Sequence, residues 1–232
     1  VDGGGLRVLD PAWTTYTSAE GPSKRAITAL ANWGDEVAVG TKHGLYRATA
    51  SSITECPVLR GEWIWALKPD DRGQSLVVAN EKALLWLDGP AASLNERRRF
   101  SINEDVWDLA QDSRGQWRLA LKRGLGLYDG EGLSLQSTLD GLPDNWVTCL
   151  LHTREDQLWL GTRGGGVSRW DGRTFHNCAV TNGLANNWVN ALAEDQRGHV
   201  WVGTDGGLSR FDGHQWRSYT RRDRLPLKPR SA

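Results

Sequence analysis

The chain repeats one short phrase six times, in which glycine precedes an apolar residue and an aspartate follows four positions later; two copies are degenerate. The apolar residues of the copies stand 39 to 42 residues apart, at Leu6, Leu45, Leu84, Leu125, Val167 and Leu208. Self-similarity at this period is typical of propellers and solenoids. Since a single copy cannot bury its own apolar face, the copies must stack, and 232 residues suffice for one array with a sizeable core.

The clearest copy, residues 189–220, predicts four short strands. Apolar and polar residues alternate from Val189, a turn at 196–198 precedes Val200, and glycines at 203–207 allow a tight reversal before Leu208. Asp212-Gly213 is a strong hairpin signal, and a fourth strand follows it. Four antiparallel strands per unit predict the blade of a β-propeller. Glycine in the middle of each unit and the period of two disfavour a helical solenoid.

The same pattern predicts an all-β propeller over residues 1–220, with five complete blades and an N-terminal half-blade that supplies only third and fourth strands. The predicted boundaries are 1–20 for the half-blade and 27–59, 64–102, 106–138, 147–178 and 189–220 for the blades. Residues 221–232 are basic and contain proline, which indicates a tail or linker. We expect strands from further sequence or another chain to close the ring, with the edge at Leu6 as the docking point.

Bulk composition excludes some classes of partner. The chain has 28 basic and 28 acidic residues, so no net field attracts nucleic acid, and no apolar stretch is long enough for a spanning helix. We therefore expect neither nucleic-acid binding nor direct membrane insertion. The chain contains no methionine and begins as if within a repeat, so we expect it to be part of a longer chain or larger assembly.

Cysteine usage leaves the redox compartment open. Cys56, Cys149 and Cys178 lack the spacing of a metal site, and Cys149 lies in an apolar strand, as a small buried residue does. A single disulfide, between Cys149 and Cys178, is an open alternative.

Two segments carry a family resemblance. Leu142-Pro-Asp-Asn-Trp-Val leads to Leu158-Trp-Leu-Gly-Thr-Arg-Gly-Gly-Gly-Val, and Leu184-Ala-Asn-Asn-Trp-Val leads to Val200-Trp-Val-Gly-Thr-Asp-Gly-Gly-Leu. They resemble the two-component regulator propeller repeat. The earlier blades have drifted; Arg118 and Ala120 stand where the repeat has tryptophan and glycine. The resemblance implies an extracytoplasmic or periplasmic sensing portion of a bacterial regulator, a platform that binds ligands, often glycans, rather than a catalyst.

The residues give little sign of catalysis. The five histidines fall at turns or strand ends in different repeat positions, without the spacing of a metal cluster. Asp88, Asp129, Asp171 and Asp212 precede glycine at hairpins, where we expect each carboxylate to cap its own turn rather than bind calcium. No helix follows the glycine runs, which disfavours phosphate binding. We expect no cofactor, no metal and no enzyme; a propeller lyase or hydrolase is a disfavoured alternative.

Thirteen tryptophans are the compositional anomaly. Trp159 and Trp201 precede Gly-Thr on second strands, where we expect core between the blades. A different group stands at the start of first strands, which line one face and the channel of a propeller. Indoles there suit sugar rings or aromatic ligands, although they can equally plug the channel. The candidate ligand or partner site consists of Trp63, Trp65, Trp107, Trp146 and Trp188, together with Asn145 and Asn187.

Two functions follow from this pattern. The first is a non-enzymatic binding or sensing domain for a glycan, a small ligand or a protein on that face. The second is a structural or scaffold subunit of a larger envelope or membrane-associated assembly, in which the aromatic face is a protein interface.

Overall fold

The computed structural model describes residues 6–10, 12–16, 27–70, 73–89 and 94–223. The chain divides into two compact units, Val1–Val106 and Trp107–Ala232, and each is considered by itself below.

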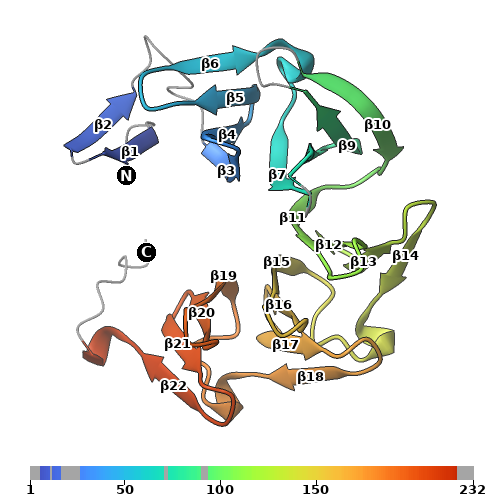
Figure 1. Cartoon of the computed structure of the whole chain (residues 1–232). Coiled ribbons are helices and arrows are strands. Elements are labelled where there is room, and N and C mark those ends of the chain that lie inside the picture. Colours follow the sequence, from blue (N-terminus) through green and yellow to red (C-terminus); the bar gives the residue numbers. More distant parts are fainter. Residues whose placement is uncertain (1–5, 11, 17–26, 71–72, 90–93, 224–232) are drawn as a thin grey trace, which may run out of the picture. The chain divides into compact units, whose positions relative to one another are not determined.

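The first unit contains one two-stranded and two four-stranded antiparallel sheets (Figure 1). In chain order its strands are β1 (Leu6–Asp10), β2 (Ala12–Tyr16), β3 (Ile27–Trp33), β4 (Glu36–Thr41), β5 (Gly44–Ala48), β6 (Ile53–Cys56), β7 (Ile64–Pro69), β8 (Ser75–Asn80), β9 (Ala83–Asp88) and β10 (Asn95–Ser101). The 3-10 turn η1 (Pro57–Leu59) follows β6. Among the described residues, β1 pairs only with β2.

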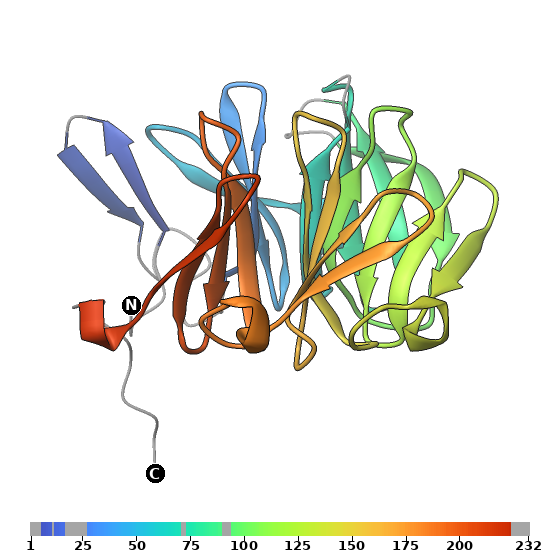
Figure 2. The same cartoon turned by 90° about the horizontal axis from the view of Figure 1, so that it is seen from below.

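The second unit contains three four-stranded sheets, each formed from consecutive strands. The strands are β11 (Val106–Gln111), whose first residue ends the first unit, β12 (Trp117–Leu121), β13 (Gly124–Tyr128), β14 (Leu133–Gln136), β15 (Val147–His152), β16 (Leu158–Thr162), β17 (Val167–Trp170), β18 (Phe175–Cys178), β19 (Val189–Glu194), β20 (Val200–Thr204), β21 (Gly207–Phe211) and β22 (Trp216–Tyr219). Short 3-10 turns follow each last strand: η3 (Thr138–Asp140), η4 (Val180–Asn182) and η5 (Arg221–Asp223). In Figure 2, η3 and η4 lie at the same end of their blades.

The predicted fold class is confirmed, since five four-stranded antiparallel sheets and a partial N-terminal sheet match propeller structures. The predicted closure of the ring at Leu6 stays a prediction, because residues 1–5 and 224–232 lie outside the described residues. For the same reason, only Arg221–Asp223 of the expected tail is described, as η5.

Asp-Gly hairpins join the third and fourth strands, and they behave as predicted in the second unit. The Oδ1 atom of Asp171 accepts hydrogen bonds from the backbone amides of Arg173 (2.9 Å) and Thr174 (2.8 Å), while Gly172 takes φ 94°. Asp129 and Asp212 cap their turns in the same way. At Asp88 the side chain instead accepts a hydrogen bond from Ser75 Oγ at 2.5 Å, and residues 90–93 lie outside the described part of the turn.

Neighbouring blades are joined through their first strands. In β3, β7, β15 and β19 the register shifts at the second residue, which marks a bulge. The bulged Thr148 donates its hydroxyl to the carbonyl of Val189 at 2.7 Å, and Thr28 donates likewise to Ile64. These two bonds connect β3 to β7 and β15 to β19, the first strands of successive blades within a unit.

Apolar side chains fill the space between the blades. In the second unit, Val147, Leu150, Leu160 and Phe175 belong to one buried cluster. A second cluster contains Cys149, Trp159, Cys178, Val189 and Val202. All three cysteines are buried, and Cys149 and Cys178 are not bonded to each other, so the alternative of a Cys149–Cys178 disulfide is wrong for this structure.

The two second-strand tryptophans have different surroundings. Trp159 is buried, and its ring lies 5.5 Å from that of Phe211 and 6.2 Å from that of Trp216 in the following blade. Trp201 is only half-buried and stacks on Tyr219 of its own blade at 6.1 Å. The expectation of core between blades therefore holds for Trp159; for Trp201, which lies in the last blade of its unit, it stays a prediction.

Candidate functional site

In the first unit, two predicted site residues form a stacked pair. Trp63 precedes β7 and Trp65 occupies its bulge; their ring centroids lie 4.5 Å apart with an interplanar angle of 12°. The Lys42 ammonium nitrogen, from the turn after β4, lies 4.4 Å from the centroid of the Trp63 ring. A small cavity of about 200 Å³ beside this pair is lined by Lys42, Gly61, Glu62, Trp63, Asn80, Glu81 and Lys82.

In the second unit, the other three predicted tryptophans lie near one another. The ring centroids of Trp107 and Trp146 are 5.6 Å apart, at 59° to each other. The guanidinium carbon of Arg163 lies 3.6 Å from the centroid of Trp146 and 4.6 Å from that of Trp188. The Lys122 ammonium nitrogen lies 5.0 Å from the centroid of Trp146. Lys122, Trp146, Arg163 and Trp188 thus form a series of alternating cations and indoles, which we call the cation–indole ladder.

The cations of the ladder come from one position of the repeat. Lys122 follows β12 and Arg163 follows β16, as Lys42 follows β4 in the first unit. Each lies over the tryptophan that leads into the next blade. Sequence reasoning missed these cations, although the signal was present: a lysine or arginine stands directly after the second strand in three of the five complete blades.

The cations of the ladder limit how much of each indole face is accessible to a ligand. Trp146 has a cation at 3.6 Å and another at 5.0 Å, its side chain is only partly exposed, and its buried Nε1 has no hydrogen-bond partner among the described residues. Trp188 is 38% exposed and is among the few large hydrophobic residues on the described surface. Of the three predicted site tryptophans in the second unit, Trp188 is therefore the one most accessible to a ligand.

The two predicted asparagines have a structural function. Asn145 Oδ1 accepts a hydrogen bond from the backbone amide of Thr138 at 2.8 Å, and Asn187 Oδ1 accepts one from Val180, also at 2.8 Å. Each bond ties the loop that leads into a first strand to the 3-10 turn at its start. These carbonyl oxygens thus fix the position of the following tryptophan.

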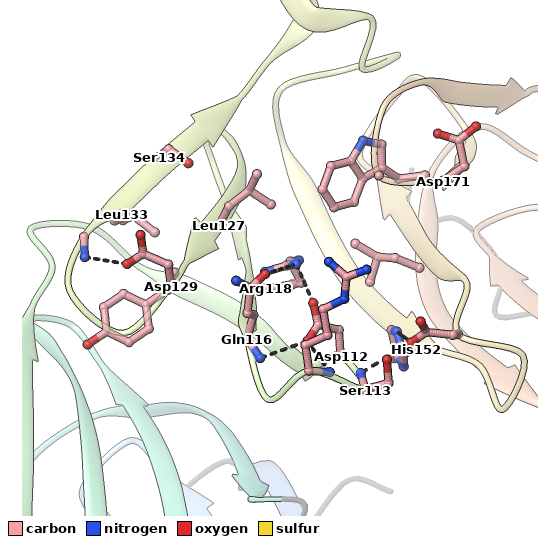
Figure 3. A pocket seen from close by; sticks show the side chains of 17 residues that line it. Asp112, Ser113, Gln116, Arg118, Leu127, Asp129, Leu133, Ser134, His152 and Asp171 are labelled. Carbon is pink, nitrogen blue, oxygen red and sulfur yellow. Dashed lines mark hydrogen bonds and ion pairs between the residues drawn. The ribbon is translucent and has the colours of Figure 1, made fainter.

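A second cavity, which sequence reasoning did not predict, lies between the blades β11–β14 and β15–β18 (Figure 3). Its volume is about 550 Å³, within the range of small-molecule sites. Arg118 and Asp112 lie on one side of it, and Asp171 lies across from Asp129. Its other lining residues are Ser113, Arg114, Gln116, Leu127, Tyr128, Gly132, Leu133, Ser134, His152, Asp156, Leu158, Trp170 and Gly172.

Arg118 explains how this cavity arises. It occupies the position that Trp159 and Trp201 hold in the next two blades, and its guanidinium lies 5.6 Å from the ring of Trp170 in the following blade. It donates to Asp112 Oδ2 at 2.5 Å, just as Trp201 Nε1 donates to Asp195 Oδ2 at 3.0 Å. Burial lowers the pKa of the Arg118 guanidinium, which its ion pair with Asp112 opposes.

The titratable groups around the turns are held by local partners. Turn amides and His176 lower the pKa of Asp171 to about 2, and the Trp201 indole and turn amides hold the pKa of Asp195 far below its usual range. His152 and Asp156 lie 3.0 Å apart, as do His199 and Asp195. In the described ranges, no three His, Cys, Asp or Glu side chains are grouped to hold a metal ion.

Comparison with known families bears on the segments that contain the cation–indole ladder. The two component regulator propeller family matches residues 141–164 and 183–206. These two segments match the two component regulator propeller repeat. Trp146 and Arg163 lie in the first repeat, and Trp188 and Asp205 lie in the second. Among curated proteins, none matches the chain.

Solved structures with the same fold belong to different kinds of protein. The extracellular domain of a putative hybrid two component system from B. thetaiotaomicron has a TM-score of 0.67 at 15% identity, over 88% of this chain and 35% of that one. YCF48 bound to D1 peptide has a TM-score of 0.68 at 15% identity, over 92% and 73%. Virginiamycin B lyase from Staphylococcus aureus has a TM-score of 0.67 at 8% identity, over 94% and 74%.

These likenesses establish the fold, which sensor domains and an enzyme share. The chain spans about a third of the length of the two component system domains it matches, 35% and 37%. Within the described part of the chain, no helix is long and apolar enough to cross a membrane.

Proposed function

We propose that the chain is a non-enzymatic ligand-binding or sensing propeller domain, and that its ligand contacts the second unit at the end where Trp146 and Trp188 lead into their blades. The observation that carries this proposal is the cation–indole ladder, in which Arg163 lies over both indoles while Trp188 stays 38% exposed. An exposed indole beside cations offers stacking and charge at one place, which suits a glycan, a small ligand or a protein side chain.

The repeats support a sensing role outside the cytoplasm. Both indoles of the ladder, Trp146 and Trp188, lie within the segments that match the two component regulator propeller repeat. Proteins of similar fold include extracellular domains of hybrid two component systems. A periplasmic or extracytoplasmic location and a connection to a signalling output are part of this proposal.

The absence of catalysis is likewise part of the proposal, because virginiamycin B lyase has the same fold. In this chain, the histidines closest to the larger cavity are engaged in their own turns: His152 pairs with Asp156, and His176 pairs with Asp171. Arg118 and Asp112 neutralise each other beside them. These groups are paired with their own neighbours. They are not arranged as an acid, a base and a nucleophile directed at one substrate atom.

The test is a titration of the protein with a panel of oligosaccharides, followed by tryptophan fluorescence and isothermal calorimetry. We expect at least one ligand whose binding is lost in Trp188→Ala and weakened in Trp146→Ala. The matched control is Trp170→Phe, which changes an aromatic residue beside the cavity of Figure 3. Binding that survives Trp188→Ala but is lost in Trp170→Phe would move the site to that cavity.

A protein partner is the alternative occupant, and YCF48 bound to D1 peptide shows that a protein of this fold is found with a peptide. In that case the chain is a scaffold subunit rather than a sensor. Cross-linking in the native source separates the two: a stoichiometric protein neighbour that is lost in Trp188→Ala supports assembly, whereas ligand binding without such a neighbour supports sensing.

A further inference from the structure

The cation–indole ladder ends at Trp188, and the residue at the next cation position of the repeat, Asp205, has the opposite charge. The position that follows the second strand holds Lys122 and Arg163 in the two preceding blades and Asp205 in the last. The backbone geometry at this position is conserved between the repeats. The amide of Arg163 donates to the carbonyl of Trp146 at 3.0 Å, and the amide of Asp205 donates to the carbonyl of Trp188 at 3.1 Å. The backbone of Asp205 therefore has the same position relative to Trp188 as the backbone of Arg163 has relative to Trp146.

Trp146 is the indole of the ladder that lies beside two cations. It has two cations, Lys122 from the preceding blade and Arg163 from its own. Trp188 has Arg163 from the preceding blade, at 4.6 Å, and no second cation among the described residues. Two cations near one indole are thus compatible with the fold, and the second cation at Trp188 is missing.

Asp205 supplies a negative charge at the repeat position from which that second cation would come. It is exposed, and its Oδ1 atom accepts a hydrogen bond from Asn190 Nδ2 at 2.8 Å, which fixes the carboxylate while Oδ2 has no hydrogen-bond partner among the described residues. A guanidinium or ammonium group next to Trp188 would interact with the indole face and pair with this carboxylate.

We propose that Trp188 and Asp205 form a binding position for an organic cation, a guanidinium or alkylammonium group supplied by the ligand. Beside Trp188, the cation takes the place that corresponds to that of Arg163 beside Trp146, so the ligand completes the ladder. This inference rests on the ligand face proposed above and specifies the chemistry at one end of it. Guanidinium suits the position best, because its flat face stacks on an indole while its edge donates to a carboxylate.

The test uses N-acetyl-arginine amide as the probe and N-acetyl-citrulline amide as its neutral isostere. Protein labelled with 5-fluorotryptophan is followed by fluorine NMR, and the Trp188 resonance is assigned from its loss in Trp188→Phe. We expect the arginine probe to shift the Trp188 resonance saturably, in the millimolar range, because one stacked cation and one ion pair hold it. The citrulline probe should leave this resonance unchanged.

Asp205→Arg is the decisive variant, since it places in the last blade the residue that the preceding blade carries. We expect its own guanidinium to shift the Trp188 resonance without ligand and to abolish the response to the probe. Asp205→Asn removes the charge with the smallest change and should weaken the response at least several-fold. Glu155→Arg is the matched control, because Glu155 is exposed in the turn between β15 and β16 and undergoes the same change of charge; it should respond as the wild type does.

Equal responses to the arginine and citrulline probes would overturn the proposal, and so would an unchanged response in Asp205→Arg. If an oligosaccharide binds through Trp188 while the arginine probe does not, the cation position is refuted and the proposed function stands. If the arginine probe binds as expected while every oligosaccharide fails, the cation position stands and the ligand is not a glycan. If neither binds through Trp188, both proposals fail.

Discussion

Gly161 lies so close to Val189 of the following blade that a Cβ atom added to the glycine would be 2.4 Å from Val189 Cγ1. The Cys149 sulfur would lie 2.6 Å away on the same side. Gly203 holds the equivalent position in the last blade, and a Cβ atom there would find its nearest neighbours, atoms of Ala191, at 3.8 Å. The same repeat position is thus tightly packed in one blade and roomy in the next.

This pair gives a matched prediction about stability. Gly161→Ala should destabilise the protein by about 1–3 kcal/mol, because a methyl group forced into a filled space moves its neighbours. Gly203→Ala should leave the free energy of unfolding nearly unchanged or raise it slightly. Chemical denaturation of both variants checks this. Equal losses would show that the glycine is needed for the strand itself rather than for contact between blades.

A second prediction concerns the Arg118–Asp112 pair. Arg118→Ala should lower stability by about 1–3 kcal/mol, because it leaves the largely buried Asp112 carboxylate without its charged donor. Arg118→Trp should recover much of the loss, since an indole can donate to Asp112 as Trp201 donates to Asp195. Thermal unfolding of the two variants measures the difference. A tryptophan variant less stable than the alanine variant would contradict the proposed equivalence of these positions.

A third prediction concerns acid unfolding. Hydrogen bonds from Thr174, His176 and Arg173 lower the pKa of Asp171 from 3.8 to about 2, and turn amides lower those of Asp129 and Asp212. Because the folded pKa lies below the unfolded one, the stabilisation is present above pH 3.8 and is lost as the pH falls from there toward 2. The melting temperature should fall over that window.

Asp171→Asn tests the assignment, because an amide oxygen can still accept from the turn but cannot ionise. Its melting temperature should depend less steeply on pH between 4 and 2 than that of the wild type, whereas Glu155→Gln, an exposed control, should follow the wild type. A wild-type slope in Asp171→Asn would place the acid sensitivity elsewhere.

A fourth prediction concerns the cysteines. Burial raises the pKa of Cys149 to about 12 and the pKa values of Cys56 and Cys178 to about 11. At pH 8 the native protein should therefore react negligibly with a thiol reagent such as Ellman's reagent, and all three thiols should react after denaturation without reductant. Only one reactive thiol in the denatured protein would restore the Cys149–Cys178 disulfide.

The sequence predicted the fold class well because its determinants are local and repeated. Asp171-Gly172 and Asp212-Gly213 specify their turns without help from distant residues, and the period shows that these turns belong to stacked copies. The surroundings of Trp159 and Trp201 were harder to predict, because the residues around a second-strand indole come from other strands, which the repeat pattern does not reveal.

The candidate site was predicted only in part. The position of Trp146 and Trp188 at the start of first strands followed from the repeat, but their cover by Lys122 and Arg163 depends on contacts between blades. The cavity beside Arg118 was missed for the same reason: its walls come from two blades, and only the departure of Arg118 from the repeat pointed to it.

The bonds from Asn145 and Asn187 to the 3-10 turns have a consequence for the kinetics of binding. The loops in front of Trp146 and Trp188 are closed by these bonds before any ligand arrives. A ligand then loses little free energy in ordering them, so association should be a single fast step limited by encounter, without a slower phase of loop closure. Differences between ligands should accordingly lie in how long each one stays bound.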